Sequence, residues 1–356
     1  MSTQAEVRHV TSVNEENRAS YLKVGIQFRV RSKRFLKGYI SDEEQKKALP
    51  QDKMVYNETS VKQVTDQTLP ESENQISLVE LAHLLTWESK RIDYKNNRHE
   101  EIAAVLDWTA AKGQRVPVVI VSPAYGKKKE STSLLASMIL QNFILRGKAV
   151  AIVRYDGIRS VGDSFKDISC RESGQHNLNM TLSQGVKDLK TTIDFCYHNE
   201  WFVPEKVILC SPSLSAVVAR RTILEDKEGL IHAWICPMGA TDPRTALTNA
   251  SGGIDYLDII QQGRKVGVAS ILGINVDWDN FWKDAMQNNM ATFEQALEEM
   301  QQINVPVGWI AGIFDAWVPS DSIKTLINNC KGPQTTIYEV PTGHLPLNGK
   351  EAINLF

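Results

Sequence analysis

Residues 207–216 read VILCSPSLSA, and this stretch decides the fold. It starts as an apolar run typical of a buried strand and turns at Ser213. Small and apolar residues then recur at helical spacing over residues 216–224. A strand, a serine at a turn and a helix in this order are typical of a nucleophile elbow, in which a strained turn lifts a hydroxyl above a sheet. Ser211 and Ser215 stand where glycines usually flank that serine, and similar turns occur without a catalytic role.

Around this stretch, short apolar runs alternate with amphipathic helical segments. Such a rhythm predicts an α/β fold with a mostly parallel sheet that carries helices on both faces. Ligands of such sheets bind at the carboxyl ends of the strands, and Ser213 lies at one of these ends. The predicted strands are residues 102–108, 116–122, 149–155, 207–210, 232–236, 305–313 and 336–340.

Two segments depart from this rhythm. Residues 1–95 are expected to form an N-terminal accessory segment, and residues 96–356 the main domain. Within the accessory segment, strict alternation predicts a strand in residues 21–35, and a capping box at Ser77 predicts a helix that runs to about Tyr94. Residues 239–300 contain no convincing strand and are expected to form a helical cap over the strand ends.

Composition excludes several kinds of function. The 356 residues carry a formal net charge of −2, and Lys and Arg are spread along the chain, so we expect no nucleic-acid partner. No stretch approaches the roughly 18 consecutive apolar residues of a membrane span, and the first residues lack the apolar core of a signal peptide. Five scattered cysteines indicate free thiols in a cytoplasmic protein, with neither a metal site nor a cofactor expected. The oligomeric state is left open.

A serine nucleophile needs a base, and two histidines follow Ser213 in the chain. His344 lies in a loop after the predicted strand 336–340, where a base is expected to stand. His232 lies inside an apolar strand run, which favours a structural role. We therefore predict His344 as the base.

The acid that orients this histidine should stand between Ser213 and His344 in the chain, because enzymes with this elbow follow that order. Asp315 follows directly on a predicted strand. Its rival, Asp321, fits the start of the next helix better. We predict Asp315 as the acid.

Stabilising the oxyanion requires two backbone N–H donors. Leu214, directly after the serine and at the start of the helix, is predicted as one donor. The second should come from the loop after strand 116–122, where Pro123 has no N–H. Ala124 and Tyr125 both remain candidates.

Aromatic residues gather in and near the predicted cap. They line an acyl or aryl pocket in one interpretation, and they form the small core of the cap itself in the other. The loop that includes Arg154 and Asp156 is expected to be structural. The candidate pocket residues are Tyr256, Trp278, Phe281, Trp282 and Trp317.

Several of these segments, taken in order, resemble the acyl-transferases of bacterial bioluminescence operons. The matching segments are Arg154-Tyr155-Asp156, Val161-Gly162-Asp163-Ser164, Ser213-Leu214-Ser215-Ala216, Gly253-Ile254-Asp255-Tyr256-Leu257, Asp315-Ala316-Trp317-Val318 and Gly343-His344. The resemblance covers roughly residues 97–350. It implies an α/β-hydrolase fold, release of a long acyl chain from acyl carrier protein through an acyl-serine, and the same three residues, Ser213, Asp315 and His344. The N-terminal 95 residues are longer than that family needs and bring to mind the fermentation-respiration-switch-like hydrolases, some of which cut carbon–carbon bonds in polyketides.

Three functions follow as hypotheses. The leading one is a serine hydrolase or acyltransferase that cleaves an acyl thioester carried on acyl carrier protein or coenzyme A. The second keeps the triad and cleaves a carbon–carbon bond, by a retro-Claisen step, or an ester in a polyketide or other natural-product intermediate. The third is a hydrolase fold that binds a partner without catalysis.

Overall fold

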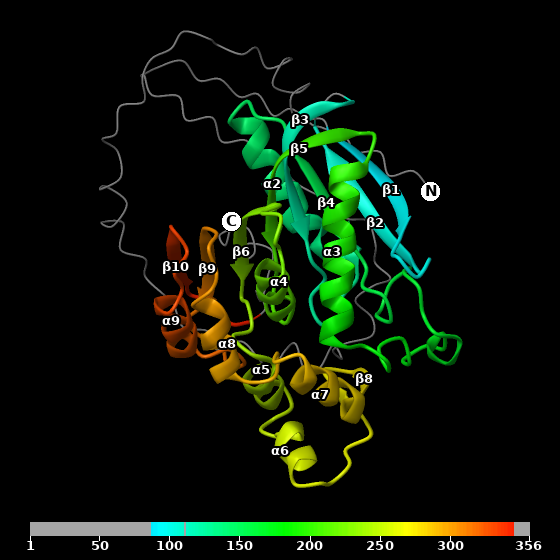
Figure 1. The fold of residues 1–356 in the computed structure, drawn as a ribbon, viewed down its shortest axis with the longest axis vertical. Coiled ribbons are helices and arrows are strands. Elements are labelled where there is room, and N and C mark those ends of the chain that lie inside the picture. The colour runs from blue at the N-terminus through cyan, green and yellow to red at the C-terminus, as the bar shows by residue number, and fades with distance from the viewer. Residues whose placement is uncertain (1–86, 110–111, 345–356) are drawn as a thin grey trace, which may run out of the picture. The chain divides into compact units, whose positions relative to one another are not determined.

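A computed structural model of the chain describes residues 87–109 and 112–344 (Figure 1). Eight strands form one sheet in the order β1-β2-β4-β3-β5-β6-β9-β10. The strands are β1 (Glu88–Lys95), β2 (Glu101–Trp108), β3 (Gln114–Val121), β4 (Ala151–Tyr155), β5 (Phe202–Cys210), β6 (Ile231–Pro237), β9 (Val307–Gly312) and β10 (Thr335–Val340). The predicted α/β class is confirmed.

The sheet is mostly parallel. Every neighbouring pair from β4 to β10 is parallel, whereas β2 runs antiparallel to both β1 and β4. Because parallel strands end on the same edge, the loops after β3, β5, β9 and β10 all leave the sheet on one side. The candidate site residues lie in these loops.

The central strands carry apolar side chains on both faces, and helices cover the sheet on both sides. In β3, Val118 and Ile120 belong to the larger core, while the alternating Val119 and Val121 belong to the smaller one. The helix α2 (Ser133–Leu145) packs on the smaller core. The larger core is covered by α3 (Leu182–His198), α4 (Ser215–Leu224) and α9 (Ser320–Asn328).

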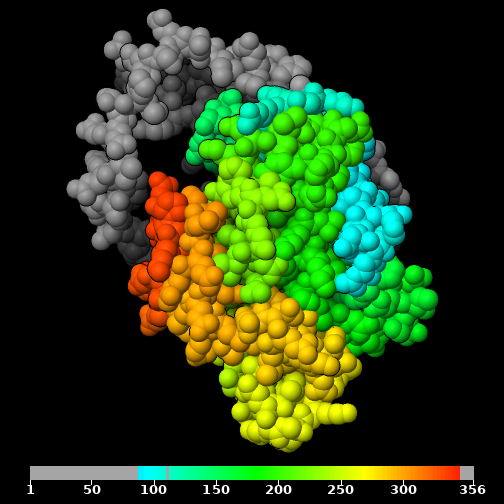
Figure 2. Space-filling view, viewed as in Figure 1, coloured from blue at the N-terminus to red at the C-terminus, as the bar shows by residue number. Residues whose placement is uncertain are grey.

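Between β6 and β9 the chain makes a long excursion that gathers at one end of the sheet (Figures 1 and 2). It contains α5 (Pro243–Ala250), α6 (Tyr256–Gln261), β7 (Val268–Ile271), β8 (Ile274–Asp277), α7 (Trp278–Gln287) and α8 (Phe293–Met300). The cap interpretation missed the strands β7 and β8, which form an antiparallel two-stranded sheet of their own. Each has four residues, too few for a clear alternation in sequence.

The predicted helix ending near Tyr94 is wrong over residues 88–94, which form most of β1. Ile92 is buried while its neighbours Arg91 and Asp93 are exposed, as in a strand at the edge of a sheet. The earlier part of that helix and the strand predicted in residues 21–35 lie outside the described residues.

Candidate active site

The turn after β5 holds Ser213 in a left-handed backbone conformation, with φ at 55°. Non-glycine residues seldom adopt this conformation, since it costs about 1–2 kcal/mol. Two backbone hydrogen bonds secure it. The Ser213 N–H donates to Pro237 O over 3.2 Å, and the Ala240 N–H donates to Ser213 O over 2.9 Å. The loop after β6 therefore fixes the turn in which Ser213 stands.

The residues around Ser213 are small because the turn packs closely against its surroundings. Ser211 is fully buried, and the Ser215 hydroxyl donates to Pro212 O over 2.6 Å. A Cβ at Gly239 would lie only 2.0 Å from Cys236 Sγ and 3.0 Å from Ala216 Cβ. Strand β5 and helix α4 therefore approach closely with serines in place of the usual glycines. Because Gly239 has no side chain, its backbone can pack against Cys236 and Ala216.

Three of the predicted side chains form a chain of hydrogen bonds. Ser213 Oγ lies 2.8 Å from His344 Nε2, and His344 Nδ1 lies 2.8 Å from Asp315 Oδ2. The other carboxylate oxygen of Asp315 accepts from the N–H groups of Trp317 and Val318, over 2.9 and 3.0 Å. Both oxygens of this buried carboxylate are thus engaged, which fixes the orientation of the imidazole.

The rival residues lie elsewhere. Asp321 is exposed in the first turn of α9, as its sequence context suggested. His232 is exposed on β6, where its Nδ1 lies 3.0 Å from Leu230 O. Neither residue is among the partners of Ser213 or His344.

Gly312, at the end of β9, is a site residue that sequence reasoning missed. A Cβ at this position would lie 2.6 Å from Thr342 O and 2.9 Å from Gly343 O. Both atoms belong to the backbone just before His344, so a side chain at Gly312 would displace this loop. The sequence signal, a single glycine at a strand end, is common in turns and gave no sign of this contact.

The three residues predicted to supply the oxyanion donors, Leu214, Ala124 and Tyr125, help to line one cavity. Among the residues that the structure describes, none accepts a hydrogen bond from the backbone N–H of any of these three. Leu214 also precedes the first turn of α4, where the helix dipole favours negative charge. The geometry keeps both Ala124 and Tyr125 as candidates for the second donor.

The cavity itself holds about 570 Å³ of empty space, part of it open to solvent. It extends from Leu214 between the loops after β3 and β4 and the helices α3 and α4. Most of its wall is apolar. The apolar side chains include Tyr125, Tyr155, Ile158, Met180, Leu182 and Val218.

None of the five predicted pocket aromatics is among the residues that line this cavity. Trp278, Phe281 and Trp282 are at most 1 % exposed and pack edge to face in sequence, with ring centroids 5.2 Å apart in each pair. Tyr256 packs against Trp278. Trp278, Phe281 and Trp282 belong to the larger hydrophobic core, and Tyr256 packs against it. Trp317 differs, because its ring lies 4.6 Å from the ring of His344.

One carboxylate lines the cavity, and sequence reasoning did not single it out. Asp188 on α3 is 1 % exposed and accepts hydrogen bonds from the Ile158 N–H and from Gln184 Nε2, over 2.8 and 2.7 Å. Burial raises the pKa of Asp188 to about 7, because these bonds and the more distant Arg159 offset only part of the desolvation, to which Glu100 adds repulsion.

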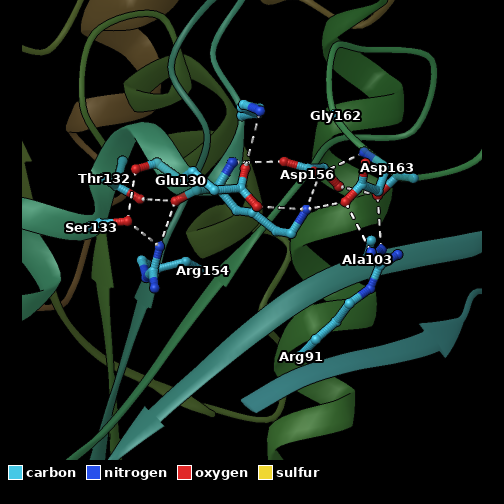
Figure 3. A network of polar contacts seen from close by, with 12 residues as sticks. Arg91, Ala103, Glu130, Thr132, Ser133, Arg154, Asp156, Gly162 and Asp163 are labelled. Carbon is cyan, nitrogen blue, oxygen red and sulfur yellow. Dashed lines mark hydrogen bonds and ion pairs between the residues drawn. The ribbon is translucent and has the colours of Figure 1, made fainter. Parts of the chain in front are cut away.

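A buried polar network secures the loop that carries Ala124 and Tyr125 (Figure 3). Lys129, 2 % exposed, places its Nζ 2.8 Å from Asp156 and 2.8 Å from Asp163. Its backbone N–H donates to Asp156 Oδ1 over 2.7 Å, and its carbonyl accepts from Arg154 over 2.7 Å. Burial lowers the pKa of the Lys129 ammonium, but the bonds to Asp156 and Asp163 outweigh it and hold this pKa above its usual range.

The loop after β4 therefore has the structural role that we expected. Asp156 is fully buried and also accepts from the Asp163 N–H over 2.7 Å. Gly162 has a φ of 107°, and a Cβ there would lie 2.2 Å from the Asp156 carboxyl group. Lys129 was missed because residues 127–129 are three consecutive lysines, a pattern typical of a solvated surface.

Two further observations concern metal ligands and membrane-spanning helices. No group of three or more His, Cys, Asp or Glu side chains within residues 87–109 and 112–344 is arranged to hold a metal ion. In these same residues, no helix combines the length and the apolar character needed to cross a membrane.

The strand order and the elbow turn define the α/β-hydrolase class, and solved structures agree. Est1E from Butyrivibrio proteoclasticus superimposes with a TM-score of 0.55 at 13 % identity, covering 74 % of this chain and 93 % of that one. Alpha/beta hydrolase domain-containing protein 10 from mouse reaches a TM-score of 0.54 at 15 % identity, covering 75 % and 94 %. At these identities, the likeness shows the fold alone.

The sequence identifies the family within this class. A family model described as "Acyl transferase" matches residues 91–347. The acyl transferase of Photobacterium phosphoreum is 23 % identical over 253 residues, which are 70 % of this chain and 74 % of the relative. That of Photorhabdus luminescens is 21 % identical over 257 residues, 68 % and 72 % of the two chains. The chain belongs to this acyl transferase family, and the predicted resemblance is confirmed.

We predict that Lys129→Met lowers the free energy of unfolding by about 3–5 kcal/mol, because it leaves the fully buried Asp156 without its ammonium partner. Urea unfolding monitored by circular dichroism measures the change. Lys112→Met is the matched control, since its pair with Glu200 is exposed on both sides and should leave the stability unchanged. Equal stability of the Lys129 variant and the wild type would show that the Lys129–Asp156 ion pair does not stabilise the fold.

A second prediction concerns pH. The folded-state pKa of Asp188 is raised, so its contribution to stability is present below the unfolded pKa near 3.8 and is lost as the pH rises through about 7. Asp188→Asn has no group that titrates at this position, so it lacks this loss of stability as the pH rises. Its unfolding free energy relative to wild type should rise by about 2–3 kcal/mol between pH 5 and pH 8. Parallel urea titrations at these two pH values measure this difference, and a constant difference would show that Asp188 titrates normally.

Proposed function

We propose that this protein is a serine acyl hydrolase or acyltransferase that cleaves an acyl thioester through an acyl-Ser213 intermediate. The observation that carries the proposal is the hydrogen-bonded chain from Ser213 through His344 to the buried Asp315. Membership of the acyl transferase family supports transfer of an acyl group as the reaction class.

The first half of the reaction forms the intermediate. Ser213 Oγ attacks the acyl carbonyl while His344 Nε2 takes the hydroxyl proton. Asp315 stabilises the imidazolium that results, because its Oδ2 accepts from Nδ1–H. When the tetrahedral intermediate collapses, the carbon–sulfur bond breaks and His344 returns the proton to the departing thiol. The acyl group is then bound to Ser213 as an ester.

Negative charge develops on the carbonyl oxygen during this step. We assign the donors to the Leu214 N–H and to that of Ala124 or Tyr125, because these residues line the cavity and no residue in the described part of the chain accepts from their N–H groups. One such donor contributes about 3–4 kcal/mol to the stability of the transition state.

The second half regenerates the enzyme. His344 removes a proton from water or from another hydroxyl acceptor, which attacks the acyl-Ser213 ester. When the bond between the acyl carbon and Ser213 Oγ breaks, His344 returns the proton to Oγ, and a fatty acid or a new ester is released. The mostly apolar cavity beside Leu214 supports an aliphatic acyl group as the part that is held during both halves. We assign the thiol to a carrier, either acyl carrier protein or coenzyme A.

The test is the reactivity of Ser213. Ser213→Ala should lower acyl thioester hydrolysis at least about a thousandfold, and it should abolish labelling by a fluorophosphonate probe. His344→Ala should do nearly the same, whereas His232→Ala, at an exposed histidine, is the matched control and should stay at the wild-type rate. A panel with an ester and a β-diketone of the same acyl group separates thioester cleavage from the alternative bonds. Wild-type turnover by Ser213→Ala would refute the proposal.

A further inference from the structure

A second hollow lies next to the cavity described above. It holds about 630 Å³ of empty space, part of it open to solvent. It lies where the turn between β1 and β2, the segment before α3, the start of α3 and α7 meet. The two hollows share Thr181, and Gln184 of the second donates to Asp188 of the first over 2.7 Å. We call this second hollow the basic groove. It is lined by Arg98, Arg159, Asp167, Asn179, Thr181, Ser183, Gln184, Lys187 and Asn280.

The basic groove combines cations with carboxylates. Its lining carries Arg98, Arg159 and Lys187 against Asp167, and two carboxylates beside the lining, Glu100 and Asp284, accept hydrogen bonds from Arg159 and Ser183. The attraction of the groove for an anion therefore comes from the cations that no carboxylate engages.

Within the groove, Arg159 is already engaged. Its guanidinium lies 2.6 Å from Glu100 and 2.9 Å from Asp167, so these pairs neutralise it. Glu100 also accepts from Asn96 over 2.8 Å. Arg159 therefore fixes the position of Glu100 and Asp167 in and beside the wall of the groove, and its charge is neutralised by these carboxylates.

Arg98 and Lys187 supply the free charge. Both are exposed, and neither side chain forms a hydrogen bond or an ion pair with any residue in the described part of the chain. This sets Lys187 apart from Lys190, one turn further along α3, whose Nζ lies 2.5 Å from Glu225. Two unpaired cations thus face one hollow that adjoins the candidate acyl cavity.

We propose that the basic groove binds an anionic group of the substrate, a phosphate or a carboxylate, while the reacting carbonyl lies at Ser213. This inference rests on the proposed function, because it assumes an acyl substrate in the adjoining cavity. Two sources supply the anion. One is the phosphate on the phosphopantetheine arm of a thioester carrier, and the other is a carboxylate at the far end of the acyl group.

The experiment compares substrates that differ in one charge. For the phosphate, one acyl group is presented on pantetheine and on phosphopantetheine. For the carboxylate, pentanoyl and glutaryl groups are each presented on N-acetylcysteamine. In one of these pairs the anionic member should have a KM about fivefold to tenfold lower, and added salt should reduce this advantage. The pair that shows the difference identifies the source.

Variants link the effect to the groove. Lys187→Gln and Arg98→Gln should each remove most of the KM advantage of the anionic substrate without changing the KM of its neutral partner. Lys190→Gln is the control and should leave both values unchanged, because Lys190 already pairs with Glu225. Equal KM values for the neutral and anionic members of both pairs would overturn the inference. So would a Lys187 variant that weakens neutral and anionic substrates alike.

A binding measurement separates this inference from the proposed function. Phosphopantetheine and glutarate, neither of which is a thioester, are titrated into the Ser213→Ala protein by calorimetry. One of them should bind, and Lys187→Gln should weaken this binding about fivefold or more. If no thioester is turned over but one probe binds, the proposed function is wrong and the proposal that the basic groove binds an anion is supported. If neither probe binds, the groove inference fails, whatever the thioesters do.

Discussion

The whole candidate site depends on the left-handed conformation of Ser213, at a φ of 55°. From this turn at the end of β5, Ser213 Oγ lies 2.8 Å from His344 Nε2, and Leu214 directly precedes α4. The conformation costs about 1–2 kcal/mol, and the surrounding structure supports it. Hydrogen bonds from the loop after β6 hold both backbone groups of Ser213, and Gly239 leaves room for the close packing.

From this turn, the arrangement of the parallel sheet accounts for the partners. Asp315 follows β9 and His344 follows β10, and both strands end on the edge where β5 delivers Ser213. The loop with Ala124 and Tyr125 follows β3 on this same edge, and the buried ion pairs of Lys129 fix its far end to the loop after β4. Buried ion pairs of this kind add little to net stability when both partners are present, but removing one partner leaves a buried charge uncompensated, at a cost of about 3–5 kcal/mol.

Much of this was predictable, because strands and the order of catalytic residue types leave local signals. The apolar runs located the central strands, and the order Ser213, Asp315, His344 selected the three side chains that the structure brings together. Contacts between distant segments leave no such signal. Lys129 stands in a run of lysines, Gly312 is a single glycine, and Asp188 lies among the polar residues of α3. Tyr256, Trp278, Phe281 and Trp282 pack against one another in the larger core, and composition alone does not reveal which aromatic side chains meet in this way.

The most direct measurement of the central claim is the mass of the enzyme during turnover. The protein is mixed with an acyl thioester, quenched in acid within the first turnovers, and analysed intact and after proteolysis. We predict a mass increase equal to one acyl group minus one proton, located on the peptide that contains Ser213. Thioester consumption with the acyl group on another residue, or with an unmodified Ser213 peptide at every quench time, would contradict the account.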